Sequence, residues 1–200
     1  MVTLNQLDLA SRIDTTRLPD FAKKLGEFLA SEMLTGYIVG GAVRDTLLGR
    51  LSEDLDVAIE ENVDAFSVAD KLSTKFGGRA VLLSKKRKTA RLMLTEKNNV
   101  LNIDISIATN GINTDLSKRD FTIDAMAVGL TSIIVDPRPT LIDPFGGVAD
   151  ISSGTIKAIT PGIFKDDPTR LLRAPRLASQ LRFRIDKQTV DTIRKQAHLV

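Results

Sequence analysis

Two glycines and two aspartates, joined by one short helix-like segment, constrain this chain more than any other feature. Gly40 and Gly41 follow an apolar run at residues 37–39 and precede residues 42–48, whose spacing predicts a helix. Asp54 and Asp56 then begin an alternating segment that predicts a strand. The order strand, glycine turn, helix, strand therefore places the glycines and the aspartates at adjacent ends of neighbouring elements.

This pattern suits the binding of a phosphate and a divalent cation. Backbone N–H groups at a glycine turn that enters a helix are unpaired and favour an anion. A strand sends residues i and i+2 to one face, roughly 6.6 Å apart, so Asp54 and Asp56 face the same site. Mg²⁺ is commonly bound by one or two carboxylates together with substrate phosphates. We therefore expect a site for a nucleoside triphosphate and Mg²⁺.

The segment that contains these residues resembles the catalytic motif of the class II tRNA nucleotidyltransferase and bacterial poly(A) polymerase family. Three further blocks resemble family motifs in the same order, at residues 118–127, 143–147 and 166–173. The resemblance spans residue 36 to about residue 184. It implies an α/β fold, with a nucleotidyltransferase (polymerase beta-like) head of mixed sheet flanked by helices, followed by an α-helical neck.

Three regions are expected on this basis. Residues 1–35 would form an N-terminal helical segment packed on the head, residues 36–160 the nucleotidyltransferase head, and residues 161–200 the start of the neck. The last segment predicts a second neck helix over residues 187–199, where the chain stops. We therefore expect the chain to be a fragment of a longer protein.

The resemblance also implies a role for residues in each block. The catalytic residues would be Asp54, Asp56 and Asp104, with Asp54 and Asp56 as the metal ligands. Asp104 can equally be a solvated strand residue. The triphosphate, the ribose and the base would be contacted, block by block, by Gly40, Gly41, Arg44, Arg119, Asp120, Asp167, Arg170 and Arg173.

The chain departs from the family pattern at three positions. Lys118 stands where the family has Arg, which keeps the charge but loses the planar donor fork. Asp124 stands where the family has Asn, which places an acceptor-only carboxylate near anionic phosphates. Asp166 replaces the usual Glu and is shorter by one methylene. The role of Asp124 is left open by the sequence.

Apolar periodicity predicts the remaining elements. Amphipathic helices are expected at residues 19–34 and 63–76. A helix is also expected over residues 115–127, and another that begins with Asp167 as N-cap and Pro168 at the first position, with a kink or break at Pro175. Strands are expected at residues 79–83, 89–94, 100–107 and 155–159.

Composition restricts the kind of protein. The chain has 28 Lys and Arg against 25 Asp and Glu. It has no Cys, which excludes disulfides and zinc–thiolate sites, and one His, which disfavours histidine-based acid/base or metal chemistry. Residues 161–200 hold nine of the cations and four of the anions, a balance that suits RNA phosphates and also fits a solvated helical face. No apolar run approaches the roughly 20 residues that span a bilayer. A cytoplasmic protein is expected.

A basic run at residues 85–88 would form a hairpin tip, which suits either RNA contact or solubility. The Gly-Arg-Arg-Phe motif of the poly(A) polymerase branch is missing there, which favours a role with tRNA.

The expected function is template-independent transfer of AMP, with or without CMP, from ATP or CTP to a tRNA 3′ end, with Mg²⁺ and release of pyrophosphate. The alternatives are a poly(A) polymerase acting on other RNA and a nucleotide- or RNA-binding module without catalysis. Transfer to a protein or small molecule is disfavoured, because minimal transferases of that kind lack the blocks at residues 143–147 and 166–173.

Overall fold

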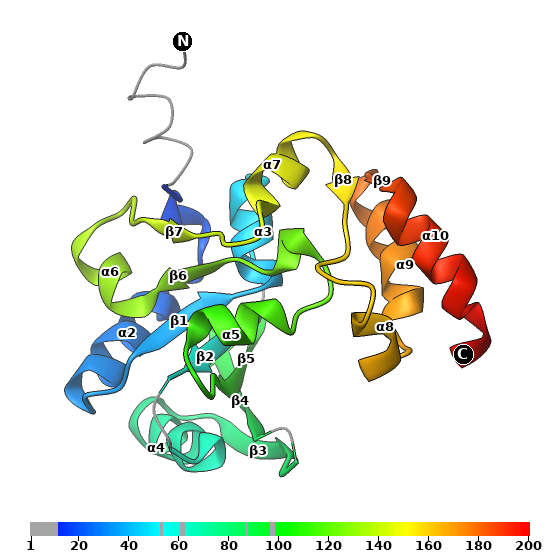
Figure 1. The fold of residues 1–200 in the computed structure, drawn as a ribbon. Coiled ribbons are helices and arrows are strands. Elements are labelled where there is room, and N and C mark those ends of the chain that lie inside the picture. The colour runs from blue at the N-terminus through cyan, green and yellow to red at the C-terminus, as the bar shows by residue number, and fades with distance from the viewer. Residues whose placement is uncertain (1–11, 53, 61–62, 87, 97–98) are drawn as a thin grey trace.

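The computed structural model describes residues 12–52, 54–60, 63–86, 88–96 and 99–200. Residues 1–11 of the predicted N-terminal segment, and Arg87 of the predicted basic tip, lie outside the described residues. The described part is built on a seven-stranded sheet of order β3-β4-β5-β2-β1-β6-β7 (Figure 1). The strands are β1 (Gly36–Val39), β2 (Asp54–Ile59), β3 (Arg79–Ser84), β4 (Thr89–Glu96), β5 (Asn99–Ile107), β6 (Ala127–Gly129) and β7 (Leu141–Ile142).

The sheet is mixed, as predicted. β2 and β5 run parallel, whereas the other neighbouring strands pair antiparallel. Alternation along β2 sends Leu55, Val57 and Ile59 into the larger hydrophobic core, while Ala58 packs in a second cluster on the opposite face. Asp54 and Asp56 alternate with the core residues, so they lie on the same face as Ala58.

One face of the sheet is covered by helices. These are α2 (Phe21–Ser31), α3 (Gly41–Leu47), α4 (Ala65–Phe76) and α6 (Leu130–Val135), preceded by the short η1 (Thr15–Arg17). The rings of Phe21 and Phe76 meet edge to face, with centroids 5.1 Å apart, and join α2 to α4. The two predicted amphipathic helices are confirmed: α2 is shorter than predicted at both ends, and α4 ends where predicted but begins two residues later.

The opposite face is covered only in part, by α5 (Ile112–Ser117). The predicted helix over residues 115–127 is wrong. The helix ends at Ser117, and the chain passes through η2 (Thr122–Asp124) into β6. Phe121 is fully buried in a third cluster and bridges to Ala158. Burying that ring requires an extended segment, which outweighs the helical pattern.

The last part of the chain packs at one end of the sheet (Figure 1). Its helices surround Phe121, Phe164 and Leu177 in the same cluster, and β8 pairs in parallel with β9. The elements are α7 (Gly147–Ser152), β8 (Thr155–Ile156), α8 (Ile163–Asp166), α9 (Arg170–Leu181), β9 (Arg184–Ile185), α10 (Lys187–Gln196) and η3 (Ala197–Leu199).

The start of α9 differs from the prediction. Its N-cap is Thr169 and not Asp167, although the Asp167 carboxylate accepts hydrogen bonds from the Thr169 N–H and hydroxyl at 3.1 and 2.6 Å. Pro175 lies inside α9 without ending it. Among the described residues, no helix is both long and apolar enough to cross a membrane.

Candidate active site

A polar cleft opens on the partly covered face of the sheet, between the strands, α5 and α9. Its volume is about 1090 Å³, and all eleven residues predicted to act in catalysis or nucleotide binding line it. They come from β2, β5, the turn into α3 and α3 itself, the segment after α5, the turn between α8 and α9, and α9. The structure therefore brings together blocks that are more than 100 residues apart in the sequence.

The carboxylates lie on neighbouring strands in the centre of the cleft. Asp56 on β2 is in register with Asp104 on β5, and Asp54 with Asn102. The Asn102 side-chain amide donates to Asp54 Oδ1 at 3.0 Å, which fixes the orientation of that carboxylate. The predicted pair Asp54 and Asp56 thus faces the cleft side by side with a third carboxylate.

The surroundings of Asp56 disfavour its charged form. Burial raises the pKa of the Asp56 carboxyl above its ordinary value, the nearby Arg119 opposes this shift, and the charges of Asp104 and Asp54 add to it. A partly buried carboxylate next to two others is stabilised by a bound cation. The described residues contain no group of three or more His, Cys, Asp or Glu side chains arranged to hold a metal alone.

The glycine turn lies directly beside these carboxylates. Gly40 has a φ of +71°, a conformation that favours glycine. A Cβ atom there would lie 2.7 Å from Arg119 Nη1 and 3.0 Å from Asp56 Oδ2. The turn, the metal-ligand candidate Asp56 and the phosphate-binding candidate Arg119 are therefore in mutual contact range. Arg119 also donates to Asp115 at 3.3–3.4 Å.

Arg44 is held by two carboxylates. Its Nε and Nη2 donate to Asp45 at 2.9 and 3.1 Å, and its Nη1 donates to Asp124 at 2.6 Å. Burial lowers the pKa of the Arg44 guanidinium, but the charges of Asp124 and Asp45 outweigh it, and the net shift is upward. Arg44 remains a cation on the cleft wall, although anions of the protein already occupy its donors.

A second arginine links α9 to the same wall. Arg173 Nε lies 2.7 Å from Asp120 Oδ2, and its Nη2 lies 3.9 Å from Asp124 Oδ2. Asp120 and Asp124 are both buried, with 5% and 4% of their surface exposed. Two buried carboxylates thus alternate with two arginines between α3 and α9, a network that the sequence did not predict.

The residues predicted to select the base also line the cleft. Arg170 donates from Nη2 to the Lys118 carbonyl at 2.9 Å, which fixes α9 against the segment after α5. Asp167 orients the first turn of α9 through Thr169. Asp167 and Arg170, three residues apart in the chain, both line the cleft.

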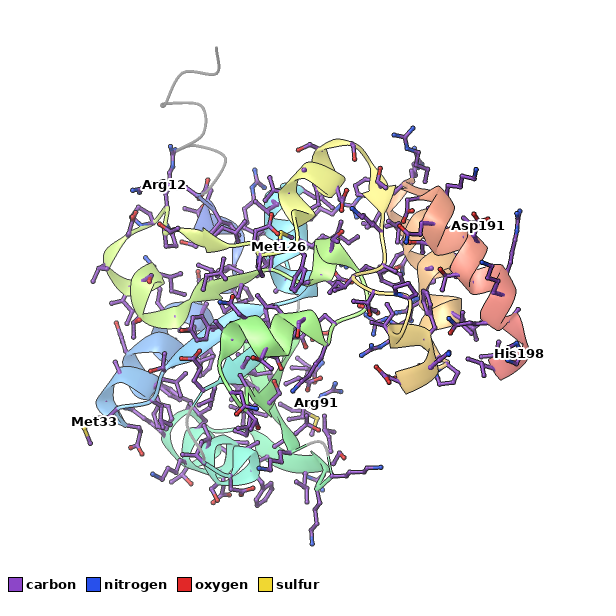
Figure 2. All side chains as sticks on the ribbon, in the orientation of Figure 1. Arg12, Met33, Arg91, Met126, Asp191 and His198 are labelled. Carbon is purple, nitrogen blue, oxygen red and sulfur yellow. The ribbon has the colours of Figure 1, made fainter. Side chains whose placement is uncertain are left out.

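The sequence pointed to no role for Arg91, which also lines the cleft. Arg91 on β4 binds Asp104 and lies between the strands and the C-terminal helices (Figure 2). The sequence pattern could have indicated its orientation, because Arg91 lies between the core residues Ala90 and Leu92 on a predicted strand and so points to the opposite face. Further lining cations are Lys86, Lys88, Lys118 and Arg176.

Comparison with known proteins places this geometry in a family. The model of the poly A polymerase head domain matches residues 36–157. A CC-adding tRNA nucleotidyltransferase of Halalkalibacterium halodurans is 35% identical over 193 residues, which cover 92% of this chain and 45% of the relative. An A-adding tRNA nucleotidyltransferase of the same organism is 34% identical over 94% of this chain and 45% of the relative.

Solved structures agree with these matches. A Thermotoga maritima CCA-adding enzyme complexed with tRNA has a TM-score of 0.77 and 34% identity, covering 94% of this chain and 44% of that one. A CCA-adding enzyme in complex with CTP has a TM-score of 0.78 and 33% identity, covering 96% and 46%. The chain therefore spans about half the length of the relatives that it matches.

Proposed function

Since the chain belongs to the poly A polymerase head domain family, we propose that it transfers a nucleotide from ATP or CTP to the 3′ end of a tRNA and releases pyrophosphate. The observation that carries this proposal is the single cleft in which the carboxylate pair, the glycine turn and the start of α9 meet. We further propose that residues 36–160 form the head and residues 161–200 the start of the neck.

The chemistry requires positioning more than covalent catalysis. The 3′-hydroxyl oxygen of the RNA attacks the α-phosphorus of the nucleotide, loses its proton to solvent, and displaces pyrophosphate as the leaving group. In the proposal, the Gly41 N–H and the side chain of Arg119 hold the triphosphate, with Asp120 close to the ribose. The Gly40 N–H already donates to the Met126 carbonyl at 3.3 Å, so Gly40 would contribute through its lack of a side chain. A side chain at Gly40 would lie against Arg119 Nη1 and Asp56 Oδ2, so the absence of one keeps both groups accessible in the proposed site.

The donor set fits Mg²⁺. Asp54 and Asp56 supply two hard oxygen ligands on one face of β2, and the substrate phosphates would supply others. Burial raises the pKa of the Asp56 carboxyl, and a bound cation would offset that cost of burial. Bound Mg²⁺ would neutralise phosphate charge and favour the ionised 3′-hydroxyl.

Selection of the base is proposed for Asp167 and Arg170. Both line the cleft and carry acceptor and donor groups suited to the edges of adenine and cytosine. Arg173 would anchor this part of α9 to the head through Asp120.

Incorporation of labelled nucleotides tests the proposal. Purified protein is incubated with Mg²⁺ and labelled ATP or CTP, together with tRNAs that end before CCA, after C and after CC. Addition of A to the CC-ended tRNA alone indicates an A-adding enzyme, addition of two C residues indicates a CC-adding enzyme, and stepwise completion indicates a CCA-adding enzyme.

Asp56→Asn removes a proposed metal ligand and is the test variant. Asp70→Asn, at an exposed position on α4, makes the same change away from the cleft and is the matched control. The first should lose about a hundredfold or more in rate, and the second should not change. Long tails on unrelated RNA would favour a poly(A) polymerase. Nucleotide binding without incorporation into any RNA would contradict the proposed transfer activity.

A further inference from the structure

Asp124 lies within the site but has no place in the proposed transfer reaction. It is 4% exposed, and its two oxygens face different arginines. Oδ1 accepts from Arg44 Nη1 at 2.6 Å, whereas Oδ2 lies 3.9 Å from Arg173 Nη2. Arg44 belongs to α3, beside the glycine turn, and Arg173 belongs to α9. One carboxylate thus joins the two sides of the cleft.

Asp124 carries a negative charge, as does the incoming triphosphate. Arg44 and Arg173 line the cleft together with Asp124, so a triphosphate that enters must share these guanidinium groups with a carboxylate already bound to them. Two anions that compete for the same cations weaken each other's binding. The other charged groups around Asp124 are Arg119, Asp120 and Asp45, of which the two carboxylates also hold Arg44 or Arg173.

We propose that Asp124 is a positioning residue that competes with the nucleotide triphosphate for Arg44 and Arg173, and thereby couples triphosphate binding to the position of α9. In the absence of nucleotide it holds both arginines. When a triphosphate binds, Arg44 interacts with the phosphates as well as with Asp124. Its ion pair with Asp124 weakens, and the ion pair between Asp124 and Arg173 becomes stronger. The inference rests on the proposed function, because it takes a nucleoside triphosphate as the ligand.

The surroundings of Asp124 act on its negative charge in opposite directions. Burial raises the pKa of the Asp124 carboxyl, and the attraction of Arg44 offsets this only in part. A raised pKa means that the charged form costs folding stability at neutral pH. Removing one partner of a buried ion pair can also cost stability, so a urea titration of Asp124→Asn at pH 7 establishes that the variant is folded before its binding is measured.

The test is an equilibrium titration of the full chain with MgATP by calorimetry, without RNA, at constant ionic strength. Asp124→Asn keeps the shape and one acceptor but removes the charge. We expect its dissociation constant for MgATP to fall about threefold to tenfold. In a separate incorporation assay with tRNA, its ratio of ATP to CTP incorporation should move toward unity, because α9 is then held less firmly against the head. A purely structural defect would weaken binding instead.

Two further variants separate the explanations. Asp136→Asn removes the same charge from the ion pair with Arg12, on the side of the molecule away from the C-terminal helices (Figure 2), and should leave MgATP affinity unchanged. In a double-mutant cycle, Arg173→Gln should remove most of the effect of Asp124→Asn on base selection.

An unchanged or weaker MgATP affinity in Asp124→Asn overturns the inference, as does additivity in the cycle. Absence of MgATP binding by the unaltered protein would instead overturn the proposed function. The two failures are therefore distinguishable.

Discussion

Arg91 and Asp104 form a two-point ion pair across the strands β4 and β5. Arg91 Nε lies 2.6 Å from Asp104 Oδ1, and Nη2 lies 2.7 Å from Oδ2. Both oxygens of Asp104, which is in register with Asp56, are therefore paired with an arginine. The net charge around the Mg²⁺ candidates therefore depends on Arg91.

Substitution of Arg91 should change the requirement for metal. Arg91→Gln removes a positive charge beside the carboxylates, so the Mg²⁺ concentration that gives half-maximal incorporation should fall about threefold to tenfold. Asp104→Asn should raise it, since Arg91 is then left without that partner. Metal titrations of the transfer reaction measure both. Arg79→Gln, an exposed arginine on β3 outside the cleft lining, is the matched control. Shifts in the same direction for Arg91→Gln and Asp104→Asn would contradict this account.

Gly40 should be intolerant of a methyl group for a reason that goes beyond its backbone. Gly40→Ala combines a positive φ with a Cβ atom 2.7 Å from Arg119 Nη1, so we expect a loss of about 1 kcal/mol or more in stability together with a large loss of activity. Gly77→Ala is the control, since its φ is +81° but no atom lies within 4 Å of its Cβ position. It should lose similar stability and keep its activity. Equal activity loss in both variants would show that strain alone is responsible.

Asp167 should govern nucleotide choice and not metal use. Asp167→Asn keeps the size of the side chain but converts one acceptor into a donor, so the ratio of ATP to CTP incorporation should shift by about tenfold, with the Mg²⁺ dependence unchanged. Asp166→Asn, one residue earlier, tests whether loss of charge is sufficient. Competition assays with both nucleotides present give the ratio directly. An unchanged ratio would remove Asp167 from the base-selecting residues.

The N-cap of α4 should make stability depend on pH. Asp64 accepts from the Ser67 hydroxyl and N–H at 2.8 and 2.9 Å, and these hydrogen bonds lower the pKa of the Asp64 carboxyl below its ordinary value of 3.8. The ionised cap therefore stabilises the fold above pH 3.8, and this contribution is lost as the pH falls through the lower folded-state pKa.

Urea titrations of Asp64→Ala should accordingly show a lower midpoint than the unaltered protein at pH 7, and a smaller difference as the pH falls below 3.8. Asp70→Asn on the same helix controls for a change of charge. A difference that stays constant over this range would mean that the cap does not act through its ionised form.

The sequence predicted elements best where one physical signal dominated. Strict alternation fixed β2 and β5, and with them the face on which Asp54 and Asp56 lie, because a strand has only two faces. The spacing of large apolar residues fixed α2 and α4. The prediction of a helix over residues 115–127 was wrong because the spacing of apolar residues does not show which hydrophobic cluster a side chain joins. Phe121 packs in the cluster formed with the C-terminal helices.

The site was predicted by its individual residues more completely than by their pairings. All eleven candidates line the cleft, but the partners of Arg44, Asp104 and Arg173 come from elements distant in the chain. No local pattern records that Arg91 faces Asp104 across β4 and β5, since this depends on strand register. The roles of these residues in transfer stay predictions.

The third hydrophobic cluster has a consequence for how this protein can be divided. Phe121 and Ile123 lie before residue 157, where the match to the family model ends, yet they pack against Phe164 and Leu177 that follow it. A fragment cut at the end of the match would carry every metal-ligand candidate and expose the rings and aliphatic side chains that α8 and α9 cover. The boundary drawn by sequence similarity is therefore not a boundary of cooperative folding, and an expression fragment should end after the helices and not before them.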